Sequence, residues 1–127
     1  MSSIRVRYIV DDVDAAVGFY RDALGFTVDM HPGPGFAALT LDDLTLLLNA
    51  PGAGGAGNAG AGVGGGPAPG GWSRFQIIVD DLAAEVDRLK GLGAGFRGDV
   101  VQGNAGDQIL VEDPAGNVVE LFQPSAG

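Results

Sequence analysis

The chain has 127 residues, a formal net charge of −9 and no cysteine. This length is enough for one domain with a buried core, and the lack of cysteine excludes disulfides and thiolate chemistry. The negative charge argues against nucleic acid or an anionic membrane as a partner. No segment approaches the roughly 20 apolar residues of a membrane helix, so we expect a soluble cytoplasmic protein.

One stretch of the sequence occurs twice. RVRYIVDDVDAAVGFYR at 5–21 is similar to RFQIIVDDLAAEVDRLK at 74–90. Each copy has alternating apolar residues, then two aspartates, then apolar residues at helical spacing. The pattern is typical of one supersecondary unit used twice, and it predicts that a ligand lies between the two copies.

The first copy begins a module over residues 3–50. The alternation over 4–10 predicts a strand whose apolar face packs under a helix and whose other face carries Arg5 and Arg7. Asp11 or Asp12 can cap a helix over 13–24, which Gly25 ends. Further strands are expected at 26–31, 36–41 and 44–49, with turns at 32–35 and 42–43. The module is therefore βαβββ.

A glycine-rich segment follows at 51–71, with eleven glycines among mainly alanine and proline. It has little to bury and a high entropic cost of ordering, which predicts a flexible linker between modules. The run at 52–57 fits the G-x-G-x-x-G pattern of dinucleotide-binding loops. We reject that match because no helical pattern follows to hold a pyrophosphate.

The second module, residues 72–124, repeats the order of the first. A strand over 74–79 leads to Asp80 or Asp81 as the cap of a helix that Gly91 or Gly93 ends. Strands are expected at 96–101, 108–112 and 118–122, with a turn at 113–117 in which Gly116 takes a positive φ.

Two longer motifs are similar to those of a known family. The segments FYRDALGF at 19–26 and EDPAGNVVEL at 112–121 resemble the vicinal oxygen chelate superfamily, as do VDDV at 10–13 and VDDL at 79–82. That superfamily holds glyoxalase I, extradiol dioxygenases, fosfomycin-resistance enzymes and bleomycin-binding resistance proteins. The resemblance implies an α+β fold in which two βαβββ modules form cups around a pocket. The cups face each other within one chain or across a homodimer, and members are commonly homodimers.

In the enzymes of that superfamily the pocket holds a divalent metal, bound by the first and last strands of each module. The resemblance places the ligand positions on Arg5, Leu47, Arg74 and Glu120. Only Glu120 can bind a metal, and two guanidinium cations would repel one. We therefore predict no metal site and no cofactor. His31 precedes a Pro-Gly turn and is expected to be a loop residue, not a ligand.

Strand alternation predicts a pocket face with polar groups from both modules. The expected ligand-binding residues are Arg5, Arg7, Leu47, Trp72, Arg74, Gln76, Leu110, Glu120 and Phe122. An arginine fork suits a carboxylate, a phosphate or a polarised carbonyl. The alternatives are structural: Glu120 only neutralises Arg5 or Arg74, Arg7 lines a wet edge or a dimer contact, and Trp72 is a core aromatic.

The first functional hypothesis is a metal-free protein that binds a small molecule, for sequestration of or resistance to an antibiotic or metabolite. The second is a cofactor-independent isomerase, cyclase or lyase in which Glu120 moves a proton and Arg5 with Arg74 hold an oxyanion. Two neighbouring arginines would stabilise the Glu120 anion and weaken it as a base. A glyoxalase-type metalloenzyme is the third hypothesis, and the ligand positions argue against it.

Overall fold

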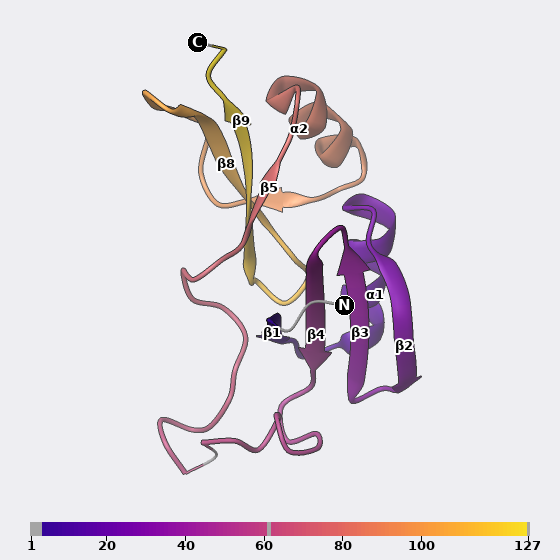
Figure 1. Ribbon diagram of the computed structural model, residues 1–127. Coiled ribbons are helices and arrows are strands. Elements are labelled where there is room, and N and C mark those ends of the chain that lie inside the picture. The colour runs from indigo at the N-terminus through magenta and orange to yellow at the C-terminus, as the bar shows by residue number, and fades with distance from the viewer. Residues whose placement is uncertain (1–3, 61, 127) are drawn as a thin grey trace. The chain divides into compact units, whose positions relative to one another are not determined.

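The computed structural model describes residues 4–60 and 62–126, which form two compact units (Figure 1). Unit 1 is Met1–Gly70 and unit 2 is Gly71–Gly127. The glycine-rich segment therefore belongs to unit 1 almost to its end. Each unit has its own sheet and follows the βαβββ order that the repeat in the sequence predicts, except that the strand after the helix of unit 2 is divided into two short strands.

Unit 1 contains a four-stranded sheet in the order β1-β4-β3-β2. Strands β1 and β4 run parallel, whereas β4, β3 and β2 are antiparallel neighbours. The expected helix over 13–24 forms as an α-helix that continues into a π-helical turn. The elements are β1 (Arg5–Ile9), α1 (Val13–Gly18), η1 (Phe19–Ala23), β2 (Thr27–Gly33), β3 (Phe36–Leu41) and β4 (Leu44–Asn49).

Unit 2 repeats this topology in a sheet of order β5-β9-β8-β6, with β7 also paired to β8. The single strand expected at 96–101 was wrong: it is two short strands, because Gly98 between them has φ +91 and turns the chain. The elements are β5 (Gln76–Ile78), α2 (Leu82–Gly91), β6 (Gly95–Phe96), β7 (Val101–Gln102), β8 (Gly106–Glu112) and β9 (Val118–Pro124).

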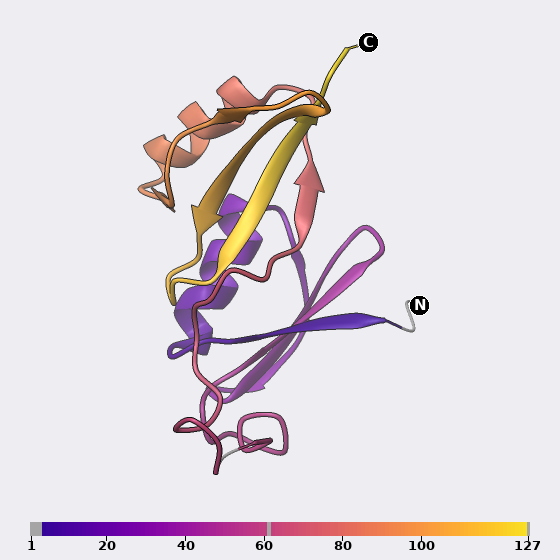
Figure 2. The same cartoon turned by 90° about the vertical axis from the view of Figure 1, so that its left-hand side faces the viewer.

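The core of each unit lies between its helix and one face of its sheet (Figure 2). Helix α1 packs on β3 and β4, where Leu46 and Leu48 are fully buried. Helix α2 packs on β9, where Val119 and Leu121 are buried in the same way. Because side chains alternate along a strand, Leu47 and Glu120 point to the opposite faces, which carry no helix of their own unit.

Both helices begin at the second aspartate of their pair. The Ala15 amide donates to Asp12 Oδ1 at 3.0 Å, and the Ala84 amide donates to Asp81 Oδ1 at 3.0 Å. Each carboxylate satisfies a helical N–H that has no partner within the helix and lies at the positive end of the helix dipole. The second aspartate of each pair is therefore explained by helix capping. None of the described helices has the length and apolar character to cross a bilayer.

The start of the glycine-rich segment forms hydrogen-bonded turns. The Gly57 amide donates to Ala53 O at 2.9 Å, and Asn58 Nδ2 donates to Gly52 O at 3.0 Å and Gly54 O at 2.8 Å. No helix follows the glycine pattern at 52–57 within the described residues, as a dinucleotide loop would require.

Candidate ligand-binding site

Three polar side chains meet on the face of the unit 2 sheet opposite α2. Arg74 precedes β5, while Gln76 in β5 pairs with Glu120 in β9. Arg74 Nε donates to Glu120 Oε1 at 2.9 Å, and Gln76 Nε2 donates to Oε2 at 2.5 Å. The Glu120 side chain is 10% exposed and the Arg74 side chain 30%. Both oxygens of this buried carboxylate are thus engaged, which offsets the cost of removing its charge from water.

Arg74 is therefore the arginine with which Glu120 forms an ion pair. Its Nη1 atom donates to Trp72 O at 3.3 Å, and its Nη2 atom makes no hydrogen bond within the described part of the chain. One edge of the guanidinium remains available as a donor.

Apolar residues continue the same row across the unit 2 sheet. Leu110 in β8 pairs with Glu120, so Gln76, Glu120 and Leu110 lie side by side. Phe122 lies two residues further along β9 and pairs with Ile78. The structure thus brings Arg74, Gln76, Leu110 and Glu120 together, as strand alternation predicts.

The equivalent row in unit 1 has different chemistry. Arg7 pairs with Leu47, and Leu47 pairs with Ala38 on β3. Leu47 is buried, whereas Arg7 and Arg5 are exposed, and neither guanidinium makes an ion pair with a described residue. Arg7 lines a cavity of about 560 Å³ in unit 1, which Arg5 does not line.

Trp72 is a surface residue, so the interpretation as a core aromatic was wrong. Its side chain is 66% exposed, and the Arg97 guanidinium lies 4.4 Å from the centre of its ring. This cation–π contact places Trp72 beside a polar network of unit 2.

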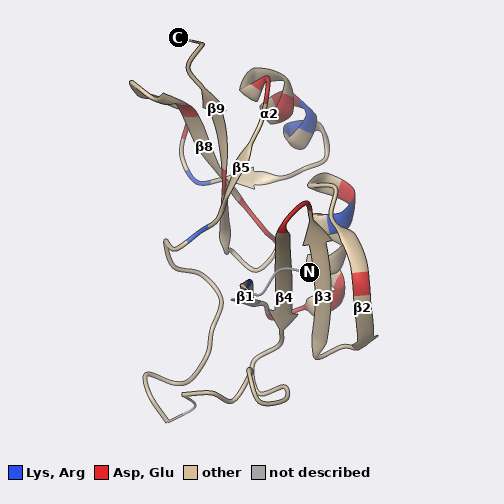
Figure 3. Cartoon of the chain, in the orientation of Figure 1, with Lys and Arg blue, Asp and Glu red and all other residues tan. Residues whose placement is uncertain are grey.

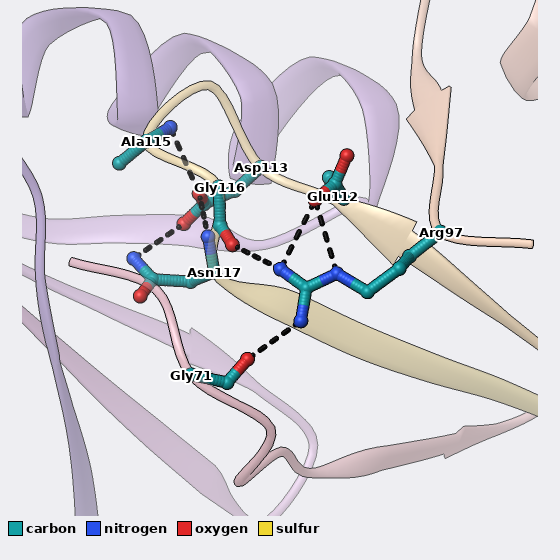
Figure 4. A network of polar contacts seen from close by, with 7 residues as sticks. All are labelled: Gly71, Arg97, Glu112, Asp113, Ala115, Gly116 and Asn117. Atoms are coloured by element: carbon teal, nitrogen blue, oxygen red, sulfur yellow. Dashed lines mark hydrogen bonds and ion pairs between the residues drawn. The ribbon is translucent and has the colours of Figure 1, made fainter.

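Arg97 is the centre of that network, and sequence reasoning did not single it out (Figure 4). It donates to Glu112 Oε2 from Nε at 3.2 Å and from Nη2 at 3.0 Å. It also donates to two main-chain carbonyls, Gly71 O at 2.7 Å and Gly116 O at 2.8 Å. The only signal in the sequence was that the strand expected at 96–101 carries Arg97 and the next expected strand, 108–112, carries Glu112. These bonds connect the segment before β5 to the turn between β8 and β9.

The turn in the EDPAGN motif is held by its own side chains (Figure 4). Asp113 Oδ1 accepts hydrogen bonds from the amides of Ala115 and Asn117, both at 2.9 Å. Asp113 Oδ2 accepts from Asn117 Nδ2 at 3.1 Å. Gly116 has φ +88, the positive value expected from the sequence. This part of the motif therefore has a structural explanation and supplies no free ligand group.

His31 lies within β2, which corrects the expectation of a loop residue. Its Nε2 atom is 2.8 Å from Asp14 Oδ1 on α1. The strand extends because Gly33 pairs with Phe36 across a two-residue connection, so the Pro-Gly run does not end it early.

Charged residues are spread over strands, helices and turns of both units (Figure 3), and each ion pair of the described residues joins one basic side chain to one carboxylate. Arg21 donates to Asp22 at 2.7 Å, and this side-chain hydrogen bond lowers the pKa of the exposed Asp22 carboxyl. The glycine-rich segment carries no charge at all.

The divalent metal of the superfamily's enzymes does not fit these residues. Within residues 4–60 and 62–126, no three His, Cys, Asp or Glu side chains are grouped to bind a metal ion. At the four ligand positions, Arg5 and Arg74 are cations, Leu47 is apolar, and both oxygens of Glu120 are engaged.

The fold is shared with several solved proteins. Lactoylglutathione lyase from Agrobacterium tumefaciens is 25% identical at a TM-score of 0.74, covering 97% of this chain and 94% of that chain. TnmS3, an antibiotic binding protein from Streptomyces sp. CB03234, is 25% identical at a TM-score of 0.69, covering 98% of each chain. The bleomycin-binding protein of Streptomyces verticillus, solved with copper(II)-bleomycin, is 22% identical at a TM-score of 0.62, covering 98% of this chain and 97% of that chain.

No curated protein matches the chain in sequence. A family profile, however, matches almost its whole length, residues 3–121. This match agrees with the two βαβββ units and with the motifs at 19–26 and 112–121. The chain belongs to the Glyoxalase/Bleomycin resistance protein/Dioxygenase superfamily.

Proposed function

We propose that the protein binds a small molecule without a metal and sequesters it, as a resistance protein does for an antibiotic or a metabolite. The observation that carries this proposal is the state of Glu120. Its carboxylate is buried and accepts from Arg74 and Gln76 at both oxygens. A carboxylate held in this way is a poor metal ligand and a poor base, because either role would require it to lose a donor.

The charges around this carboxylate indicate the class of ligand. Arg74 keeps one guanidinium edge available, and Arg5 and Arg7 are further exposed cations of the proposed binding set. A guanidinium fork presents paired donors to a carboxylate, phosphate or carbonyl oxygen. Leu110 and Phe122 supply apolar surface beside Glu120. The proposed ligand is therefore polar, and it carries a carboxylate or an aromatic ring.

Two proteins of the same fold have binding functions. TnmS3 is described as antibiotic binding, and the Streptomyces verticillus protein as bleomycin-binding. Bleomycin itself is a poor match for the arginine-rich residues of this chain because it is a cationic drug. The proposal includes a homodimer in the cytoplasm, with Leu47 and Trp72 as further contacts.

A cofactor-independent isomerase, cyclase or lyase is the alternative, since Glu120 remains a buried carboxylate beside a guanidinium. In that case Glu120 is the proton carrier, and arginine holds the oxyanion. The similarity to a lactoylglutathione lyase supports an enzyme of this fold. The third hypothesis, a metalloenzyme, conflicts with the donor set.

Mass spectrometry can distinguish the binder from the enzyme. The protein is incubated with a panel of metabolites and natural products, and it is analysed natively and after denaturation. A binder releases its ligand with unchanged mass and retention time, and Glu120→Gln keeps most of the affinity. A released compound that is chemically changed, with the change abolished by Glu120→Gln but kept in Glu85→Gln, would overturn sequestration. Glu85 is a suitable control because it pairs with Arg88 on the surface of α2.

A further inference from the structure

Unit 1 contains a cavity that the strand pattern alone does not predict. It has a volume of about 560 Å³. It lies beside Phe36 at the start of β3 and Asn49 at the end of β4, which pair with each other. Arg7 lines it from β1, Pro32 and Gly33 from the end of β2, and Gly35 from the connection to β3. Residues 53–56 of the glycine-rich segment form its remaining wall.

Two polar groups on this wall have no partner in the described structure. Asn49 is 5% exposed, and its Oδ1 atom is buried without a hydrogen bond. The Arg7 guanidinium makes no ion pair with the described residues. Buried polar groups in folded proteins are nearly always hydrogen-bonded, so the Asn49 Oδ1 atom is a place where a ligand or a water molecule can supply the missing donor.

The glycine-rich wall has a defined shape. The Ala50 amide donates to Gly35 O at 3.0 Å, which connects the start of the segment to the turn before β3. A Cβ added at Gly57 would lie 2.3 Å from Ala53 N and 2.4 Å from Ala50 O. Only glycine fits there, because any side chain would displace the turn that carries residues 53–56.

The charge of the lining indicates an anion. None of the described residues that line the cavity is acidic, although the chain carries a net charge of −9. Arg7 is therefore a cation without a local counter-charge. Phe36 adds an aromatic side chain to the same lining.

We propose that this cavity binds a small aromatic carboxylate. The Arg7 guanidinium holds its carboxylate, the Asn49 amide bonds a hydroxyl or amino group next to that carboxylate, and the ring lies against Phe36. This proposal rests on the proposed small-molecule binding, and it adds a place and a ligand chemistry within unit 1. It also gives the glycine-rich segment a role as a wall of the site.

Salicylate is a suitable probe because it has a carboxylate beside a hydroxyl on one ring. A titration of the ¹⁵N-labelled full chain is expected to move the amide signals of Gly33, Gly35 and residues 53–56 to saturation. Salicylamide, which lacks the charge, is expected to bind at least about tenfold more weakly. No saturable shift with salicylate, or saturable shifts confined to other residues, would overturn the proposal.

Two variants test the polar groups. Arg7→Gln is expected to weaken salicylate binding at least about tenfold. Arg21→Gln removes an exposed cation of the same unit and is expected to change the affinity for salicylate less than about twofold. Asn49→Leu is expected to weaken binding without lowering the thermal midpoint, because it removes an unpaired buried amide. Binding unchanged in Arg7→Gln, or an Asn49→Leu protein that is destabilised but binds normally, would contradict the assignment.

A third variant tests the wall. Gly57→Ala is expected to weaken salicylate binding, and Gly62→Ala is the matched control because a Cβ there meets nothing within 4 Å. Equal binding by both variants would show that the segment is no part of the site. If salicylate does not bind but another compound from the mass-spectrometry panel does, the site proposed here is contradicted and the proposed small-molecule binding is still supported.

Discussion

Units 1 and 2 have the same backbone pattern but different side chains on the sheet face opposite the helix. The Val10 amide donates to Asn49 O at 2.9 Å, and the Val79 amide donates to Phe122 O at 2.9 Å. The row Arg7, Leu47 and Ala38 in unit 1 corresponds to Gln76, Glu120 and Leu110 in unit 2. The strand registers are therefore equivalent, although none of the paired residues in these rows is the same.

The difference lies in how polar groups are satisfied. In unit 2, Glu120 accepts from Arg74 and Gln76, and Arg97 bonds Glu112 and two carbonyls. In unit 1, Arg7 has no such counter-ion within the described chain, and the Asn49 Oδ1 atom is buried alone. The helix-facing side carries the core and must stay apolar, while the other face is free to vary. On this face, unit 2 therefore satisfies its buried carboxylate with its own side chains, whereas unit 1 leaves a buried amide oxygen without a hydrogen bond.

The largest expected effect comes from a carboxylate placed on the wrong face of β4. Leu48→Glu puts a charge into the core under α1, and we expect a loss of about 4 kcal/mol or more in the free energy of unfolding. Leu47→Glu imitates Glu120 in unit 2 and lies opposite Arg7, so its cost should be smaller by about 2 kcal/mol. Chemical denaturation followed by circular dichroism measures both. Equal losses would show that the face opposite α1 tolerates a charge no better than the core does.

Removing either partner of the Arg74–Glu120 ion pair should have unequal effects on stability. Arg74→Leu leaves the Glu120 carboxylate buried with only Gln76 as a donor, and we expect a loss of about 2–3 kcal/mol. Glu120→Leu leaves Arg74 partly exposed and able to reach water, with an expected loss of about 1 kcal/mol or less. In the double variant the two losses should fall short of their sum by about 1–2 kcal/mol.

Trp72 is the only tryptophan and belongs to unit 2, so its fluorescence during denaturation measures this cycle. Arg88→Leu is the control because Arg88 and Glu85 form a more exposed pair on α2, and it should change stability by less than about 0.5 kcal/mol. A strictly additive double variant would mean that Arg74 and Glu120 do not stabilise each other.

Strand positions were predictable where apolar runs are separated by a clear turn. Residues 36–41 and 44–49 were placed correctly, because apolar residues flank the short turn at 42–43. Residues 96–101 were not, because the apolar residues at both ends hid the effect of Gly98. Strand alternation also put Arg74 and Glu120 on one face, with either Arg5 or Arg74 as the partner of Glu120, and in the structure the partner is Arg74.

The residues that sequence reasoning missed depend on long-range contacts. Asn49 stands out because its Oδ1 atom is buried without a hydrogen bond. No sequence pattern predicts that a buried atom will lack a partner. Arg97 bonds the carbonyls of Gly71 and Gly116, which any residue type could supply. The turns at 50–59 were hidden by the composition of a segment that looks like a flexible linker.

The smallest expected effects concern the helix caps, where the two units are the same. Asp12→Ala and Asp81→Ala each remove one hydrogen bond of 3.0 Å to a helical amide, and each should cost about 1 kcal/mol. The preceding aspartates provide matched controls: Asp11→Ala and Asp80→Ala remove the same charge without a cap, and should cost less than about 0.5 kcal/mol. Denaturation followed by circular dichroism can measure all four variants. If Asp11→Ala cost as much as Asp12→Ala, the dipole and not the hydrogen bond would explain the repeated aspartates. Asp12→Ala and Asp81→Ala should lower the free energy of unfolding equally, whereas Leu47→Glu and Glu120→Leu should lower it by different amounts. That result would place the difference between the two units on the face opposite the helix.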